Sequence, residues 1–130
     1  MPSIFTRIIQ GELPGTFVHR DDKCVAFMSI QPLRPGHTLV VPIQEVDHWI
    51  DLPEELIQHL FTTAQRLSQA IQRAFQPRKV GLMVAGLEVP HVHLHLVPIH
   101  QLHDLDFSRQ DKQANPADIA AAAEKIRQAH

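Results

Sequence analysis

The sequence predicts a single α+β domain, in which a five-stranded antiparallel sheet carries one long helix and short helices near its two ends. Three observations support this prediction. Short apolar runs bounded by glycine and proline occur over residues 16–42 and 80–98, as expected for strands. Apolar residues follow helical spacing between about 51 and 75. The order of strands, long helix, strands and terminal helix is typical of an α+β domain with its helices on one side of the sheet.

Composition narrows the classes of function. The 130 residues are 44% hydrophobic and 20% charged, which suits one domain with a real core. The formal net charge is −2, whereas nucleic-acid-binding domains usually have an excess of basic residues. We expect no signal peptide and no membrane span, because no basic segment precedes an apolar run at the start and no apolar stretch is long enough. A single cysteine, Cys24, predicts an inert core thiol in a cytoplasmic protein.

The first half of the chain predicts one short helix and three strands. Ser3 is the expected helix cap, and Gly11 and Pro14 end the helix. His37 lies where a loop with two prolines meets a strand, a position that suits either a site residue or a capping residue at the surface. The predicted elements are a helix over residues 3–10, a hairpin of strands over 16–19 and 24–30, and a third strand over 38–41.

The second half predicts a long helix, two strands and a terminal helix. Asp51 is expected to cap the long helix, with Pro53 in its first turn and Phe75 near its end. Asn115 is expected to cap an alanine-rich helix whose thin apolar face would dock on a partner subunit or fray. The other predicted elements are a central strand over residues 80–85, a strand over 91–98, a surface loop over 100–113 and the terminal helix over 115–128.

The chemistry is concentrated in residues 91–97, which have the sequence HVHLHLV between two prolines. In a strand, alternate side chains face opposite sides. His91, His93 and His95 are therefore predicted to share one face, while the apolar residues between them enter the core. Each imidazole needs hydrogen-bond partners and titrates near neutral pH, so such a row indicates a function.

Three interpretations of this row remain open on the residues alone. The first is a solvent-facing strand that happens to carry histidines. The second is a metal site, which would need a further ligand such as His37 or His48, because three side chains in a straight row do not share one ion. The third is imidazole catalysis, in which a neutral histidine attacks phosphorus while its far ring nitrogen is held by a hydrogen bond.

Residues 91–97 closely resemble the histidine triad (HIT) motif, His-φ-His-φ-His-φ-φ, in which φ is apolar. Residues 3–14, 21–27 and 34–42 resemble the opening segment of that family, its early hairpin and its strand with a fourth histidine. The chain is most similar to bacterial HIT-like proteins related to the nucleoside phosphoramidate hydrolases. The resemblance predicts one HIT domain over 1–130, with a core over about 3–100 and a C-terminal loop and helix over 101–130.

The resemblance implies a homodimer whose sheets join, a nucleotide-like ligand and an enzyme that cleaves a nucleoside phosphoramidate or related phosphoanhydride through a phosphohistidine. It implies that His93 is the nucleophile, that the carbonyl of His91 holds the other ring nitrogen, and that His95 and His37 contact the phosphate. No cofactor is implied to be required, with zinc as a lesser alternative. The implied substrate-binding residues are Phe5, Ile8, Phe27, Ser29, Ile30 and Glu88.

The sequence departs from the family pattern at several positions. Ser29 stands where the family has a ribose-binding aspartate, and a hydroxyl makes weaker contacts than a carboxylate. Leu87 replaces a glutamine on the phosphate side, and Ala85 is the nearest residue to a lost asparagine. The Cys-x-x-Cys pair of some zinc-containing bacterial members is absent near Phe5. Two alternatives therefore stand beside the enzyme: a nucleotide- or phosphate-binding module with little turnover, and a His-x-His metal protein.

Overall fold

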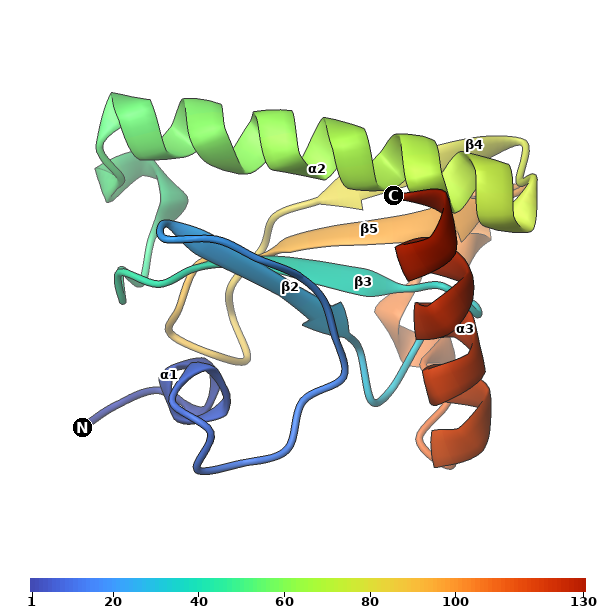
Figure 1. Ribbon diagram of the computed structural model, residues 1–130, viewed down its shortest axis with the longest axis horizontal. Coiled ribbons are helices and arrows are strands. Elements are labelled where there is room, and N and C mark those ends of the chain that lie inside the picture. The colour runs from blue at the N-terminus through green and yellow to red at the C-terminus, as the bar shows by residue number, and fades with distance from the viewer.

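The computed structural model describes residues 1–130 and has one five-stranded antiparallel sheet with the strand order β1-β2-β3-β5-β4. The long helix α2 lies along the sheet, and α3 crosses one end of it (Figure 1). This arrangement confirms the predicted α+β class. The strands are β1 (Phe17–Arg20), β2 (Cys24–Met28), β3 (Thr38–Pro42), β4 (Lys79–Met83) and β5 (Leu94–Ile99).

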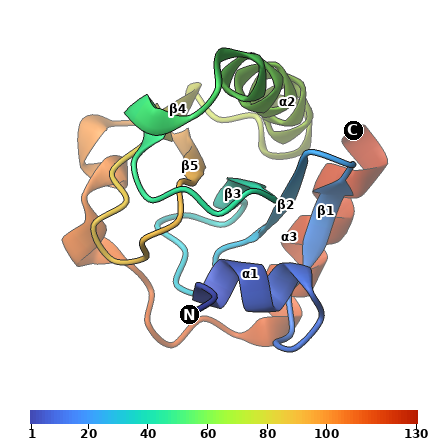
Figure 2. The same cartoon turned by 90° about the vertical axis from the view of Figure 1, so that its left-hand side faces the viewer.

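The helices occupy both faces of the sheet. Figure 2 shows α1 on the side opposite α2, so the prediction that all helices lie on one side is wrong for α1. The physical reason is Phe5, which packs edge-on against Phe27 of β2 at a centroid distance of 5.5 Å. The helical elements are α1 (Ile4–Ile9), α2 (Glu54–Phe75), α3 (Pro116–Ala129) and three short 3₁₀ turns, η1 (Trp49–Asp51), η2 (Leu102–Leu105) and η3 (Phe107–Arg109). No helix has the length and apolar character needed to cross a membrane.

Alternation along the strands divides the core into two clusters. The main cluster lies between the sheet and the helices α2 and α3, and the smaller one lies under α1. Val92, Leu94 and Leu96 enter the main cluster, as the alternation predicts. The three histidines between them are thereby directed to the α1 face of the sheet. The apolar stripe of α2 faces the same main cluster through Leu56, Leu60, Ala64, Leu67, Ala70 and Ile71.

Two strand predictions need correction. The strand predicted as central is β4, at the edge of the sheet, where Leu82 keeps 41% of its surface exposed. It is an edge because the last strand, β5, pairs between β3 and β4 rather than outside them. The histidine strand begins at Leu94, so His91 and His93 precede the regular ladder. All three histidines are nevertheless buried.

The helix predictions also change at their ends. Asp51 belongs to η1 and does not cap α2, whose N-cap is Pro53 and has no side-chain cap. The end at Phe75 is as predicted. In α3, the side chain of Asn115 caps the helix by accepting a hydrogen bond from Ala117. The prediction that α3 docks on a partner or frays is wrong, because its thin apolar face packs into the main core of this chain through Ala122, Ala123 and Ile126.

Candidate functional site: a buried histidine cluster

Four predicted site histidines lie together on the α1 face of the sheet. His91 and His93 come from the segment before β5, His95 from β5 and His37 from the loop that enters β3. All four are buried, so the interpretation of a solvent-facing strand is wrong. Each ring must therefore find partners inside the protein, and those partners decide which nitrogen of each imidazole carries the proton.

His91 is held at both ring nitrogens. Its Nε2 lies 2.8 Å from the carbonyl oxygen of Pro42, which only accepts, so Nε2 donates. Its Nδ1 lies 2.7 Å from Oγ of Ser3 and accepts the hydroxyl proton. Ser3 Oγ also accepts from the backbone N–H of Thr6 as the cap of α1. The sequence predicted Ser3 as a cap only, and its second role on His91 was missed because the partners are 88 residues apart.

His93 presents one free nitrogen. Its Nδ1 donates to the backbone carbonyl of His91 at 2.8 Å, the contact implied by the family resemblance. A neutral imidazole that donates from Nδ1 has a lone pair on Nε2. The ring of Phe5 packs edge-on against His93 at a centroid distance of 4.8 Å and restricts its orientation. His93 therefore has the tautomer and the fixed position that a nucleophile requires.

His37 and His95 form a directional pair. The backbone N–H of Leu33 donates to Nδ1 of His37 at 3.0 Å, so neutral His37 carries its proton on Nε2. That nitrogen lies 2.9 Å from Nδ1 of His95 and donates to it. His95 must then carry its own proton on Nε2. One backbone amide thus leaves His95 with an N–H group for a ligand.

Burial keeps these imidazoles neutral. Loss of water, reinforced by the other histidines, lowers the pKa of His37 to about 4 and that of His95 to about 3. Burial also lowers the pKa of His91 and of His93, although hydrogen bonds to carbonyl oxygens oppose the shift. Near pH 7 all four rings are therefore uncharged, which is the condition on which the tautomer assignment rests.

A cavity of about 190 Å³ opens against His93 and His95. Its other wall comes from the turn before the triad and from η3. Phe107 of η3 packs edge-on against His95 at a centroid distance of 4.8 Å. The sequence does not identify Phe107 as a site residue, because the polar composition of residues 100–113 predicts a surface loop. The lining residues are Ala85, Gly86, Leu87, Glu88, His93, His95 and Phe107.

The residues predicted to bind substrate do not all lie at this cavity. Glu88 does. Phe5 and Phe27 are buried in the smaller core cluster, with Ile8 packed against it. Ile30 is 77% exposed. Their contacts with a substrate stay a prediction.

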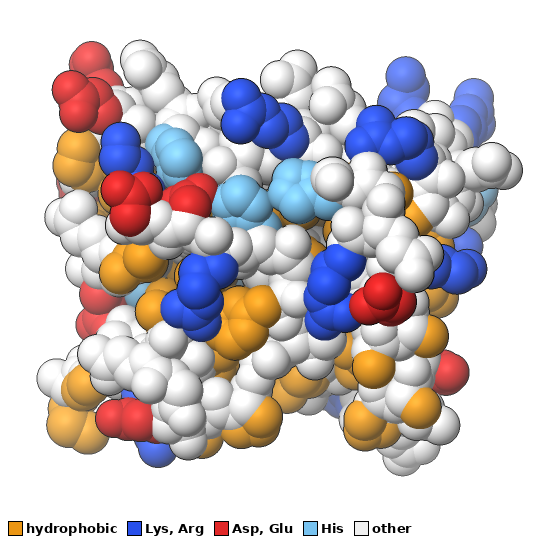
Figure 3. Space-filling model, viewed as in Figure 1, with side chains coloured by type: hydrophobic (Ala, Val, Ile, Leu, Met, Phe, Trp, Pro, Cys, Tyr) orange, Lys and Arg blue, Asp and Glu red, His pale blue; other side chains and the backbone are white.

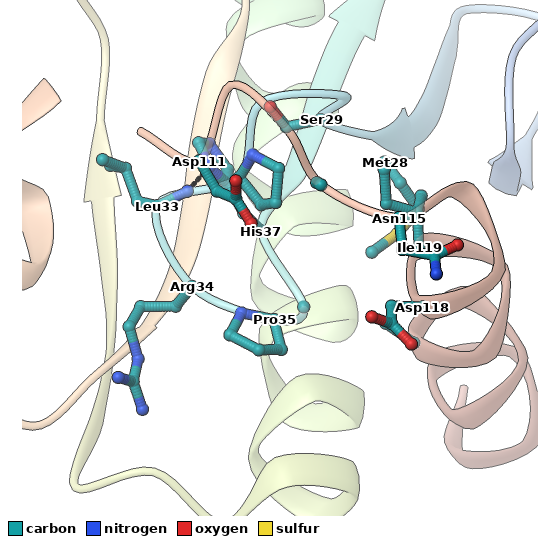
Figure 4. Close-up of a pocket in the computed structure, with 14 residues that line it drawn as sticks. Met28, Ser29, Leu33, Arg34, Pro35, His37, Asp111, Asn115, Asp118 and Ile119 are labelled. Atoms are coloured by element: carbon teal, nitrogen blue, oxygen red, sulfur yellow. Dashed lines mark hydrogen bonds between the residues drawn. The ribbon is translucent and has the colours of Figure 1, made fainter. Parts of the chain in front are cut away.

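Ser29 lines a second, larger cavity of about 220 Å³ between the loop before His37 and the start of α3 (Figure 4). His37 forms part of its wall, while Arg34, Asp111 and Asp118 give it charged groups. The Ser29 hydroxyl accepts the backbone N–H of Gln31 at 3.2 Å. Ser29 and His93 therefore lie on different cavities, which touch through the His37–His95 pair.

The arrangement favours imidazole chemistry over a metal site at the triad. Both ring nitrogens of His91 and of His37 are already bonded to protein groups. His48, the other proposed ligand, is exposed at the start of η1 and makes no hydrogen bond to the four histidines. A nucleophilic lone pair on His93 beside an N–H donor on His95 instead suits attack on a phosphoryl group.

Comparison with known proteins identifies the family to which this chain belongs. A HIT-like protein from Bartonella henselae has the same fold, with a TM-score of 0.86 at 28% identity over 98% of this chain and 96% of that one. Adenosine 5′-monophosphoramidase of Saccharomyces cerevisiae is 32% identical over 96 residues, which are 73% of this chain and 61% of the relative. Asymmetrical bis(5′-nucleosyl)-tetraphosphatase of Schizosaccharomyces pombe is 33% identical over 98 residues, which are 72% of this chain and 52% of the relative. The HIT domain matches residues 10–102, so this chain belongs to the HIT domain family.

Proposed function

We propose that this protein is a nucleotide-binding hydrolase or transferase that cleaves a nucleoside phosphoramidate or a related phosphoanhydride through a phosphohistidine on His93. The observation that carries the proposal is the hydrogen bond from His93 Nδ1 to the carbonyl of His91, which leaves a lone pair on Nε2 of a neutral, buried imidazole at a cavity. Two relatives support it by their chemistry, since one is named for a P–N bond and the other for a phosphoanhydride.

The proposed reaction has two steps. In the first, His93 Nε2 forms a bond to phosphorus while the bond from phosphorus to the leaving group breaks. The His95 Nε2–H group donates a hydrogen bond to the phosphoryl oxygens, and the leaving amine takes up its proton from solvent. In the second, water attacks the phosphohistidine, frees the Nε2 lone pair of His93 and releases one proton to solvent, which balances the proton taken up in the first step. The sum is hydrolysis to an amine and a nucleoside monophosphate.

The test is turnover of adenosine 5′-phosphoramidate and a small panel of other nucleoside phosphoramidates. His93→Ala is expected to abolish release of nucleoside monophosphate while the circular dichroism spectrum is retained. His100→Ala removes an exposed histidine outside the cluster and is the matched control, with full activity expected. Equal turnover by His93→Ala and native protein would contradict the proposal. Mass spectrometry of an acid-sensitive nucleoside monophosphate adduct on His93 after a rapid quench provides a second readout.

One observation favours a second candidate, a nucleotide sensor with little turnover. Leu87 is 95% exposed at the cavity, where the family resemblance implies a glutamine amide, and Ser29 provides no carboxylate. Fewer polar groups then hold a bound phosphate in position for attack. Calorimetric binding of adenosine monophosphate, with no product after long incubation of the phosphoramidate panel, would favour this candidate over the enzyme.

We also propose a homodimer in which two copies meet through β4 and the adjoining surface of α2. β4 is a sheet edge, and such edges are usually paired or covered. Phe61 of α2 and Leu82 of β4 are both exposed and line one shallow hollow together with Val80. An apolar edge of this kind suits pairing with a second copy of itself, which would join the two sheets.

A further inference from the structure

A second cluster of potential ligands lies apart from the triad, where the β1–β2 turn meets α2. His19 of β1 and His59 of α2 both approach one carboxylate oxygen, Asp21 Oδ2, through Nε2 at 2.7 and 2.9 Å. The thiol of Cys24, at the start of β2, lies 3.6 Å from the same oxygen. Histidine and acidic side chains gather close to α2 on the surface shown in Figure 3. Two imidazoles and a thiol thus surround one carboxylate oxygen.

The turn holds Asp21 in a ligand-like orientation. Its Oδ1 accepts the backbone N–H groups of Lys23 and Cys24, each at 2.8 Å. Oδ2 is therefore directed at the imidazoles. Burial of the carboxyl opposes its ionisation, but the hydrogen bonds from His19, the two backbone N–H groups and His59 together hold its pKa well below the usual range. Asp21 Oδ2 thus lies between two imidazoles.

Cys24 has no surface exposure, and its Sγ lies 3.8 Å from Oγ1 of Thr63. In the absence of a cation, a thiol buried in this way is a neutral and unreactive group. A soft divalent cation is the kind of partner that converts such a thiol into a bound thiolate, and it does so with release of the proton to solvent.

We propose that His19, Asp21, Cys24 and His59 form a binding site for a zinc-like divalent cation. The ligand atoms of His19, Asp21 and Cys24 all lie within 4.8 Å of one another, and His59 Nε2 adds a fourth donor beside Asp21. Tetrahedral zinc bonds to nitrogen, oxygen and sulfur set ligand atoms roughly 3.3–3.6 Å apart. The Cys24–Asp21 separation of 3.6 Å already fits this range. The hydrogen-bonded pairs His19–Asp21 and His59–Asp21 would each lengthen by about half an ångström when a cation replaces the proton between the two ligand atoms.

The donor set selects the kind of cation. A thiolate and two imidazoles suit zinc and its transition-metal neighbours, whereas magnesium and calcium prefer oxygen ligands. The ring of His19 is held at its other nitrogen, because Nδ1 lies 3.2 Å from Nε2 of His130, which follows α3. This contact directs Nε2 of His19 toward Asp21. A bound cation would link the β1–β2 hairpin to α2, on the sheet face opposite the triad. The proposal is independent of the phosphoryl chemistry assigned to His93.

The test uses the full chain without a histidine tag, purified with a chelator and titrated with cobalt chloride. Cys24 is the only cysteine in the chain, so a thiolate-to-cobalt charge-transfer band in the near ultraviolet reports on this site alone. The expected result is one equivalent of cobalt with that band, displaced by zinc. Native protein that is folded and shows no such band overturns the proposal.

Variants separate this site from the triad. Cys24→Ser is expected to remove the band, and His59→Gln to weaken cobalt binding at least tenfold. His59 is half-buried on the surface of α2, so this substitution spares the core, and circular dichroism checks the fold. His93→Ala removes a triad histidine and is expected to leave the titration unchanged. Binding that survives His59→Gln but is lost in His93→Ala would place the cation at the triad and overturn the proposal.

Discussion

His37 Nε2 lies 2.9 Å from His95 Nδ1, and the direction of this hydrogen bond is set by the backbone amide of Leu33. Because that amide occupies Nδ1 of His37, the proton of His37 must lie on the side of His95, and the proton of His95 must lie on Nε2. The loop of residues 31–36 thus determines which hydrogen-bonding group His95 offers to a ligand.

The first prediction follows from this pair. His37→Ala removes the donor to His95 Nδ1 and frees His95 to adopt the other tautomer, in which Nε2 has a lone pair facing the phosphoryl oxygens. We expect kcat to fall by about 10²-fold, the usual cost of one lost transition-state donor, with a smaller change in KM. His37→Gln is the control, because its amide can donate again and restore part of the rate. Equal rates for His37→Ala and native protein contradict the proposed role of the pair.

The second prediction concerns acid. A buried histidine whose folded pKa is lowered binds its proton more readily in the unfolded chain, so the free energy of unfolding falls as pH drops below the unfolded pKa of about 6.5. For His37, whose folded pKa is about 4, the loss between pH 6.5 and 5 is on the order of 2 kcal/mol. Burial of His95 adds to the same trend.

Urea unfolding at pH 7, 6 and 5 measures this effect. Asp21 does not obscure it, because a lowered carboxyl pKa stabilises the folded state throughout this range and loses its contribution only below about pH 4. His37→Gln removes one of the titrating rings and should reduce the slope. A free energy of unfolding that is flat from pH 7 to 5 would be inconsistent with neutral, buried imidazoles.

The third prediction concerns Ser3, which caps α1 and donates to His91 Nδ1. Ser3→Ala removes both contacts and leaves a buried imidazole nitrogen without a partner. We expect a loss of about 1–3 kcal/mol in the free energy of unfolding, from one helix cap and one buried hydrogen bond. Ser3→Thr keeps the hydroxyl and should lose less. Chemical denaturation at pH 7 measures the free energy of unfolding of native protein, Ser3→Ala and Ser3→Thr. Identical values for Ser3→Ala and native protein would contradict this account.

Some of these features were accessible from the sequence and others were not. The alternation of histidines with Val92, Leu94 and Leu96 is local, and strand geometry alone predicted the division between the core and the site. The bond of Ser3 to His91 and the edge position of β4 depend on pairings between distant segments. The cluster around Asp21 was missed for the same reason, since His59 comes from α2, 38 residues away. Local patterns do not encode such long-range neighbours.

The fourth prediction concerns Phe107, whose ring contacts His95 and forms one wall of the cavity. Phe107→Ala removes this wall, so both His95 and a bound substrate gain freedom of movement. We expect kcat/KM for phosphoramidate hydrolysis to fall about tenfold, because even small displacements at a reacting centre are costly. Phe107→Leu retains apolar bulk and should lose less. Unchanged kcat/KM in Phe107→Ala would show that the 3₁₀ turn η3 takes no part in the site.

The fifth prediction concerns assembly. Leu82→Asp places a charge in the middle of the exposed apolar edge formed by β4 and α2, and burial of an unpaired carboxylate between two copies is strongly unfavourable. We expect native protein to sediment as a dimer and Leu82→Asp as a monomer at micromolar concentration. Leu87→Asp is the matched control, because Leu87 is exposed at the cavity and lies outside this edge. Analytical ultracentrifugation distinguishes the outcomes, and a native monomer would overturn the proposed dimer. A monomeric Leu82→Asp protein that still turns over phosphoramidates would show that the histidine cluster is complete within one chain.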